Sequence, residues 1–167
     1  MAKSVYIHIP FCKQKCKYCS FVSFTDNSKI LGYIFSLLKE IDVNYSGEEI
    51  KTLYFGGGTP SLIDVQYLKK IINKFNLTPN CEITLELNPD DIDEDYARNL
   101  INIGINRLSI GSQSFNDNIL NLIGRRHNAE QIIKAVKIAK NGIFIYGLLF
   151  LPKIDPSKKI TAFSPHS

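Results

Sequence analysis

The sequence predicts an α/β fold in which about five βα units build a parallel sheet. Five short runs rich in apolar and β-branched residues, at 5–10, 52–55, 82–87, 107–110 and 143–151, are typical of strands. Segments with helical periodicity separate these runs, and strands that alternate with helices favour parallel pairing. With 167 residues, of which 44% are hydrophobic, the chain is long enough to enclose one substantial core.

Four segments between the strands repeat apolar residues three and four positions apart. This spacing places one apolar stripe along a helix, which is the pattern of a helix packed against a sheet. In chain order the stripes are Tyr33, Leu37 and Ile41; Leu62, Val65, Leu68, Ile72 and Phe75; Tyr96, Leu100 and Ile103; and Ile132, Val136 and Ala139.

The charge and the apolar content limit the partners that we expect. The formal net charge is only +4 and the lysines are spread along the chain, so we expect no nucleic-acid partner. The longest apolar run, at 142–152, is too short to span a bilayer, and residues 1–11 lack the features of a secretory signal. We therefore expect no transmembrane segment and a cytoplasmic location, where cysteines stay reduced.

Four unusual motifs each follow a predicted strand. They are the cysteine loop at 12–19, GGGTP at 56–60, ELNP at 86–89 and GSQSF at 111–115. The carboxyl ends of parallel strands share one face of a sheet or barrel, and α/β proteins build their sites there. We therefore expect the four motifs to converge on one functional site.

Three of the four cysteines lie close together, as Cys12, Cys16 and Cys19, and the fourth is Cys81. In a reducing compartment this clustering is more typical of metal or catalytic residues than of disulfides. A structural zinc site needs a fourth ligand, for which His8 or Cys81 is a candidate. A [4Fe–4S] cluster on three thiolates would instead leave one iron open to another ligand.

The CxxxCxxC spacing within YIHIPFCKQKCKYCSF resembles that of the radical S-adenosylmethionine superfamily. FGGGTPSL, ELNPDD, RLSIGSQSF and LIGRRHN follow in the order seen in the oxygen-independent coproporphyrinogen III oxidases and the related HemW haem chaperones. The resemblance implies an incomplete parallel β/α barrel of the partial TIM type. It also implies a [4Fe–4S] cluster on Cys12, Cys16 and Cys19, with S-adenosylmethionine on the open iron and cleaved there to a 5′-deoxyadenosyl radical.

The same resemblance implies roles for other residues in the motifs. Tyr6, Gly57 and Glu86 would contact this S-adenosylmethionine, with Gly57 at its methionine part and Glu86 at its ribose hydroxyls. The residues that would line an adjoining site, which takes a second S-adenosylmethionine in the oxidases, are Tyr18, Gly58, Thr59, Gln113 and Arg125.

Each of these residues also has an ordinary structural interpretation. The glycines at 56–58 suit a tight turn before a helix that starts near Pro60, and Glu86 suits a strand end already in water. Tyr6 and Tyr18 could equally be packed in the core. Gln113 could be an ordinary loop amide, and Arg125 an ordinary exposed cation. We expect Cys81 to be a small buried hydrophobe.

Two features favour the chaperone branch of the resembled family. The oxidases carry a fourth cysteine two residues after the third, where this chain has Phe21, and GRRHN at 124–128 also resembles the chaperones. This branch implies haem or porphyrin, an electron donor and a haem-acceptor protein as partners. The alternatives are the oxidase, which decarboxylates coproporphyrinogen III oxidatively, and a non-catalytic metal-binding remnant. His127 is either a haem ligand or, as we expect, a solvent-facing residue at a helix start.

The resembled proteins continue well past the length of this chain. Its fifth strand, within IFIYGLLFLP, also lacks the aspartate of their DLIYGLP-like segment. We therefore expect a shortened form, whether a truncated product, a shifted reading frame near Asn141 or a fragment. Residues 1–152 would be the N-terminal part of the barrel domain. Residues 153–167, which are polar and punctuated by proline, would be a disordered or aberrant tail.

Overall fold

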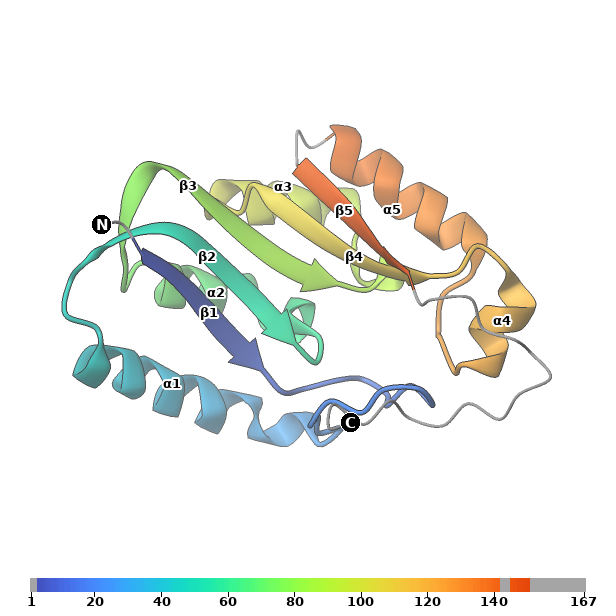
Figure 1. The fold of residues 1–167 in the computed structure, drawn as a ribbon, viewed down its shortest axis with the longest axis horizontal. Coiled ribbons are helices and arrows are strands. Elements are labelled where there is room, and N and C mark those ends of the chain that lie inside the picture. The colour runs from blue at the N-terminus through green and yellow to red at the C-terminus, as the bar shows by residue number, and fades with distance from the viewer. Residues whose placement is uncertain (1–2, 142–144, 151–167) are drawn as a thin grey trace.

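A computed structural model describes residues 3–141 and 145–150 of the chain. These residues form one five-stranded sheet and its connecting helices (Figure 1). The strands are β1 (Lys3–Ile9), β2 (Glu49–Gly57), β3 (Asn76–Leu87), β4 (Arg107–Gln113) and β5 (Ile145–Phe150). All neighbouring strands are parallel, and their spatial order is β1-β2-β3-β4-β5. The predicted α/β fold with a parallel sheet is confirmed.

The helices connect successive strands. They are α1 (Ile30–Asn44), α2 (Val65–Ile72), α3 (Glu94–Asn102), α4 (Asp117–Leu122) and α5 (Ala129–Asn141), with 3-10 turns η1 (Asn27–Lys29), η2 (Pro60–Leu62) and η3 (Pro89–Asp91). Asp64, Asp93 and Asn116 cap α2, α3 and α4 by accepting hydrogen bonds from the first turn of each helix. In Figure 1, α2 and α3 lie behind the sheet, and α5 lies near β5.

The predicted helical stripe from Leu62 to Phe75 is divided in the structure. Leu62 lies in the turn η2, and Asp64 then starts a separate helix that ends at Ile72. The sequence did not indicate α4, because its six residues are too few to show a helical period. The other three predicted stripes lie in or beside α1, α3 and α5, and each predicted strand is present with different bounds.

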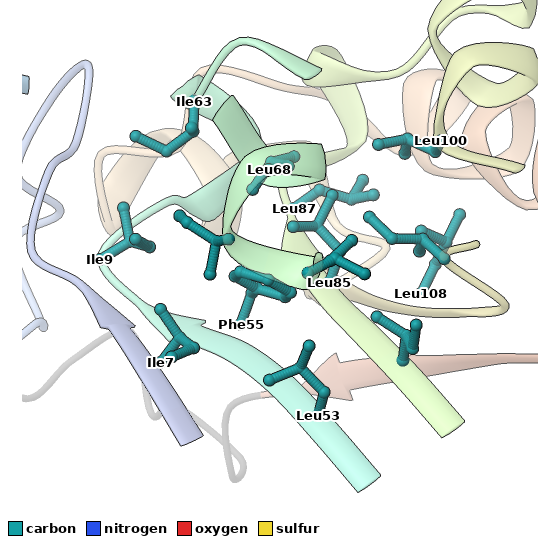
Figure 2. Packing of buried hydrophobic residues seen from close by; sticks show 14 of the residues in the cluster. Ile7, Ile9, Leu53, Phe55, Ile63, Leu68, Leu85, Leu87, Leu100 and Leu108 are labelled. Atoms are coloured by element: carbon teal, nitrogen blue, oxygen red, sulfur yellow. The ribbon is translucent and has the colours of Figure 1, made fainter. Parts of the chain in front are cut away.

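One face of the sheet is apolar and packs against the helices. Phe55, Leu53 and Leu85 on this face are fully buried, together with Leu68 of α2 and Leu100 of α3 (Figure 2). Each such side chain stabilises the fold by roughly 1.5–3 kcal/mol when it leaves water. The helices therefore hold the strands, and through them the strand ends, in fixed positions.

The opposite face of the sheet carries polar and aromatic side chains, because successive residues of a strand point to opposite faces. Tyr6 of β1 is paired in register with Tyr54 of β2, which is paired with Thr84 of β3. Further along, Glu86 of β3 is paired with Ser109 of β4. This face therefore leads toward the motifs at the carboxyl ends of the strands.

The predicted tail at 153–167 lies outside the described residues, as does the predicted domain boundary at residue 152. Within the part of the chain that the structure describes, no helix is long and apolar enough to cross a membrane.

Candidate functional site

A cavity of about 330 Å³ lies at the carboxyl ends of the strands. Residues as far apart in sequence as Tyr6 and Arg125 meet in its wall. It is lined by all eleven residues that the family resemblance assigns to the cluster and to the two cofactor positions: Tyr6, Cys12, Cys16, Tyr18, Cys19, Gly57, Gly58, Thr59, Glu86, Gln113 and Arg125. The parallel topology thus brings the four motifs to one place.

The cysteine loop begins directly after β1 and folds back on itself. The Cys12 amide donates to the Phe24 carbonyl at 2.9 Å, and the Phe24 amide donates to the Pro10 carbonyl at 2.7 Å. The rings of Phe11 and Phe24 also lie against each other, with centroids 6.3 Å apart. These contacts fix both ends of the segment that carries the three cysteines.

The middle of the cysteine loop is tied to the turn after α4. The Lys17 amide donates to the Ile123 carbonyl at 3.0 Å, and the Gln14 side chain donates to the Gly124 carbonyl at 2.8 Å. Tyr18 packs against a small apolar cluster formed by Leu120, Ile123 and Ile132. The cysteine loop is therefore held against the turn at 123–124, although 110 positions separate Gln14 from Gly124.

The four cysteines are free thiols, and three of them line the cavity. Cys81 is only 6% exposed and belongs to the hydrophobic core, as predicted. His8 interacts with the Tyr6 hydroxyl at 3.2 Å and does not line this cavity. Within residues 3–141 and 145–150, no group of three or more His, Cys, Asp or Glu, the three cysteines included, is gathered closely enough to hold a metal ion. Neither candidate for a fourth zinc ligand, His8 or Cys81, lines the cavity with the three cysteines.

The glycines after β2 allow the GGGTP turn to approach the cysteine loop. Gly57 has a φ of +116°, which other residues rarely adopt. A Cβ atom on Gly58 would lie 2.5 Å from the Phe11 carbonyl oxygen, and the Gly58 amide donates to the Ile9 carbonyl at 2.8 Å. Only glycine fits this close contact between two backbones.

Glu86 lies at the end of β3 beside this turn. Its carboxylate accepts hydrogen bonds from the Tyr54 hydroxyl at 2.7 Å and the Gly57 amide at 3.1 Å. Burial and the hydrogen bond to Glu86 raise the pKa of Tyr54 to about 12, so its hydroxyl stays a donor. Tyr6 stacks on Tyr54, with ring centroids 5.9 Å apart. Glu86 is therefore a positioned acceptor and not a freely solvated strand-end residue.

Thr59 is buried between the cysteine loop and the end of β3. Its hydroxyl lies 3.6 Å from the Cys12 sulfur, and the Asn88 amide donates to the same hydroxyl at 3.4 Å. The predicted roles of Gly58 and Thr59 place them in an adjoining site, and in the structure Thr59 also contacts a cysteine of the cluster motif.

Arg125 reaches into the cavity from the turn before α5. Its Nη1 donates to the Cys16 sulfur and lies near the Tyr18 hydroxyl, each at 3.4 Å, and its Nη2 donates to the Asn88 side chain and, at 2.7 Å, to the Gly111 carbonyl. Burial raises the pKa of Tyr18 to about 12, although Arg125 acts in the opposite direction. Arg125 is therefore a hydrogen-bonded residue of the cavity wall, and the alternative of an ordinary exposed surface cation does not hold.

Gln113 ends β4 in a left-handed conformation with a φ of +67°, the only non-glycine residue with a positive φ in the described part of the chain. This conformation costs on the order of 1 kcal/mol for a residue with a Cβ atom. Such residues cluster at active sites, ligand clamps and switch regions. The backbone here orients an amide side chain in the wall of the cavity.

His127 corrects one prediction. We expected a solvent-facing side chain at a helix start, but His127 is 3% exposed and lines the cavity just before α5. Its Nε2 is 3.1 Å from the Ser112 carbonyl. Burial lowers the pKa of His127, and the charge of Arg125 adds to this effect, so the imidazole is neutral near pH 7. The sequence carried no periodicity that could reveal this burial.

Four buried side-chain atoms in the described residues have no hydrogen-bond partner: Ser23 Oγ, Asp90 Oδ1, Arg125 Nε and His127 Nδ1. All four residues line the same cavity. An unpaired buried polar group costs about 1–3 kcal/mol, so native proteins rarely leave several together. The cavity is therefore suited to an occupant with polar groups.

Asp91 lies behind the cavity wall, and the sequence had not singled it out. Its carboxylate, 3% exposed, accepts from Lys13 at 2.7 Å, Arg126 at 3.2 Å, Ser61 at 3.1 Å and Asn88 at 3.1 Å. Burial alone would raise the pKa of Asp91, but Lys13, Asn88 and Arg126 together hold it below its usual range. The only sequence signal was its place after ELNP.

A family model described as the radical SAM superfamily matches residues 6–160. The chain belongs to the radical SAM superfamily. Membership implies a [4Fe–4S] cluster and S-adenosylmethionine, and the radical SAM chain has residues that fit both. Three thiols, the usual ligands of an iron–sulfur cluster, line one cavity, and the unpaired polar atoms in its wall suit a polar small molecule.

Relatives of the radical SAM chain occur in both predicted branches. The HemW haem chaperone of Synechocystis sp. is 38% identical over 156 residues, which cover 86% of this chain and 38% of the chaperone. The oxygen-independent coproporphyrinogen III oxidase of Paracoccus denitrificans is 32% identical, with 98% of this chain and 41% of the oxidase covered.

The structure of the radical SAM chain is similar to that of the coproporphyrinogen III oxidase HemN from Escherichia coli. The TM-score is 0.78 at 28% identity, over 87% of this chain and 36% of that chain. The predicted partial barrel is consistent with this similarity. The chain spans about two fifths of the length of these relatives.

Proposed function

We propose that this radical SAM chain holds a [4Fe–4S] cluster on Cys12, Cys16 and Cys19 and binds S-adenosylmethionine beside it. The observation that carries the proposal is one cavity that combines these three thiols with four unpaired polar side-chain atoms. When bound, the cluster would supply the electron that cleaves S-adenosylmethionine. Free thiols and an oxygen-sensitive cluster suit a reducing cytoplasm.

The residues of the chain would hold and orient the cofactor. Glu86, already fixed by Tyr54 and the Gly57 amide, has carboxylate lone pairs for ribose hydroxyls. Gly57 and Tyr6 line the cavity with Glu86, and we assign Gly57 to the methionine part of the cofactor. We assign the adjoining site to Tyr18, Gly58, Thr59, Gln113 and Arg125.

We further propose that the chain handles haem as the HemW chaperones do, by binding it and passing it to an acceptor protein. Phe21 supports this branch, because it takes the place of a fourth cysteine, is largely exposed and lines the cavity. An exposed aromatic ring offers an apolar contact to a flat macrocycle. Oxidative decarboxylation of coproporphyrinogen III is the second candidate, supported by the similarity to the oxidases.

Anaerobic reconstitution with iron and sulfide tests the first proposal. The reduced protein is then measured by electron paramagnetic resonance (EPR) with and without S-adenosylmethionine, and Cys16→Ala is the control. We expect a [4Fe–4S] signal that changes when S-adenosylmethionine is added, and no such signal from Cys16→Ala. A wild-type protein without a cluster, or with a signal indifferent to S-adenosylmethionine, contradicts the proposal. Haemin titration of the same samples, followed by absorbance, tests haem binding separately.

A further inference from the structure

Arg125 is fixed against a cysteine that the proposed function assigns to the cluster. Its Nη1 donates to the Cys16 sulfur at 3.4 Å, and its Nη2 donates to the Gly111 carbonyl at 2.7 Å and to the Asn88 side chain. The Tyr18 hydroxyl lies 3.4 Å from Nη1. Contacts on both terminal nitrogens leave the guanidinium little freedom to turn away from the sulfur.

The backbone around Arg125 is shaped for this position. The Arg125 amide donates to the Leu120 carbonyl at 2.9 Å, and Gly124 turns the chain with a φ of +74°. On the opposite wall, a Cβ atom on Gly111 would lie 3.2 Å from Nη2 of Arg125. A glycine at this position therefore lets the guanidinium approach the end of β4.

The charge of Arg125 is not neutralised by a carboxylate within the described residues. Of the other cations that line the cavity, Lys13 pairs with Asp91 and Arg126 pairs with Asp90 and Asp91, whereas Lys15 forms no ion pair among the described residues. All the hydrogen-bond partners of Arg125 are carbonyl, amide, hydroxyl or thiol groups. The cavity therefore receives a full positive charge next to Cys16.

We propose that Arg125 sets the reduction potential of the cluster by stabilising its reduced state. A [4Fe–4S]²⁺ cluster with three thiolates has a net charge of about −1, and one added electron makes it about −2. A nearby cation and an N–H···S hydrogen bond both favour the more negative state, which raises the potential. This inference rests on the proposed cluster, and its electron comes from the external reductant.

The role differs from the contact with a second S-adenosylmethionine that the family resemblance gives to Arg125. Charge tuning operates through Nη1 and the Cys16 sulfur, whether or not a second molecule binds. A measurement made without S-adenosylmethionine therefore reports the effect of the Arg125 charge on the cluster alone.

The test is an EPR-monitored redox titration of the reconstituted protein, with dithionite, mediators and no S-adenosylmethionine. The variants are Arg125→Gln and Arg125→Met, which remove the charge, and Arg125→Lys, which keeps it. Arg107→Gln is the matched control, because it removes the same charge at the opposite end of β4, where Arg107 pairs with Glu82. Iron and sulfide contents are measured first for every protein.

We expect the uncharged variants to hold the cluster at a more negative midpoint. The ratio of reduced to oxidised cluster at a fixed potential should fall about tenfold, which is ~59 mV for one electron. The midpoint potential of Arg125→Lys should stay closer to that of the wild type, and the midpoint potential of Arg107→Gln should equal the wild-type value.

An uncharged variant with the wild-type midpoint overturns the inference, and so does Arg125→Lys shifted as far as Arg125→Gln. Loss of the cluster from both uncharged variants overturns it as well, because Arg125 would then be needed for assembly and not for tuning. A wild-type protein that takes up no cluster instead refutes the proposed function on which the inference rests.

Discussion

Single residues decide how closely the GGGTP turn approaches the cysteine loop. Gly58 contacts the backbone of Phe11 directly, and Thr59 then reaches the Cys12 sulfur. Backbone atoms cannot move aside as the end of a long side chain can. The distance between the two loops therefore depends on the absence of one carbon atom.

Gly58→Ala should displace the cysteine loop and reduce the iron content after reconstitution. Because its Cβ atom would lie 2.5 Å from the Phe11 oxygen, the free energy of unfolding should fall by about 1–3 kcal/mol. Gly32→Ala in α1 is the control, since nothing lies within 4 Å of its Cβ position and alanine favours a helix. Urea unfolding and iron analysis check both. Equal stability and iron content in the two variants would contradict this account.

For single residues, the sequence predicted which side chains line the site better than it predicted their burial, contacts and backbone conformation. The motifs pointed to Glu86 and Arg125, and both line the cavity. Spacing carried no information about the burial of His127 or the strain at Gln113, because tertiary contacts and one backbone dihedral decide these. The contact of Arg125 with Cys16 was equally invisible, since 109 positions separate them.

At the scale of elements, the site depends on short turns that lie outside the regular helices and strands. The turn η3 carries Asp91, which holds Lys13 of the cysteine loop, Ser61 of η2 and Arg126 of the turn before α5. One carboxylate thus joins four segments around the cavity. Sequence periodicity located the strands and most helices, but 3-10 turns have no detectable period, and their contacts became visible only in the fold.

Asp91→Asn should weaken this junction in a pH-dependent way. The folded pKa of Asp91 is lowered, so its charge stabilises the fold fully above the unfolded value of about 3.9. This stabilisation is lost as the pH falls through the lower folded pKa. At pH 7 the variant should therefore be about 1–3 kcal/mol less stable than the wild type.

Urea unfolding from pH 7 to pH 3 checks this prediction. The difference in the free energy of unfolding between the wild type and Asp91→Asn should become smaller as the pH falls. Asp95→Asn is the control, because Asp95 is an exposed carboxylate paired only with Arg98 on the surface of α3, and it should change stability by less than about 1 kcal/mol. A difference that stays constant with pH would show that the charge of Asp91 is not the cause.

At the scale of the whole molecule, the sheet separates two kinds of cysteine. Cys81 lies within β3 among core residues, whereas the other three gather at the carboxyl ends of the strands. The sequence predicted this division, because a lone cysteine is most simply a small buried hydrophobe, whereas motifs at the ends of parallel strands share one site.

Cys81→Ala should leave the iron and sulfide content of the reconstituted protein unchanged. Burial raises the pKa of the Cys81 thiol, which disfavours the thiolate that metal binding requires. Cys12→Ala, made in parallel, should lose the cluster. Loss of metal from Cys81→Ala with normal folding by circular dichroism would instead support a four-cysteine metal module.

The order of the strands also has a consequence for biosynthesis. Because strand order follows chain order, each strand can join its predecessor as the polypeptide leaves the ribosome. The cysteine loop, however, is made with β1, while its contacts at Ile123, Gly124 and Arg125 are translated roughly a hundred residues later, which takes about 5–20 s at typical rates of synthesis. During that interval the three thiols lack their finished cavity. The proposed cluster can therefore meet its complete cavity only after this segment has been translated.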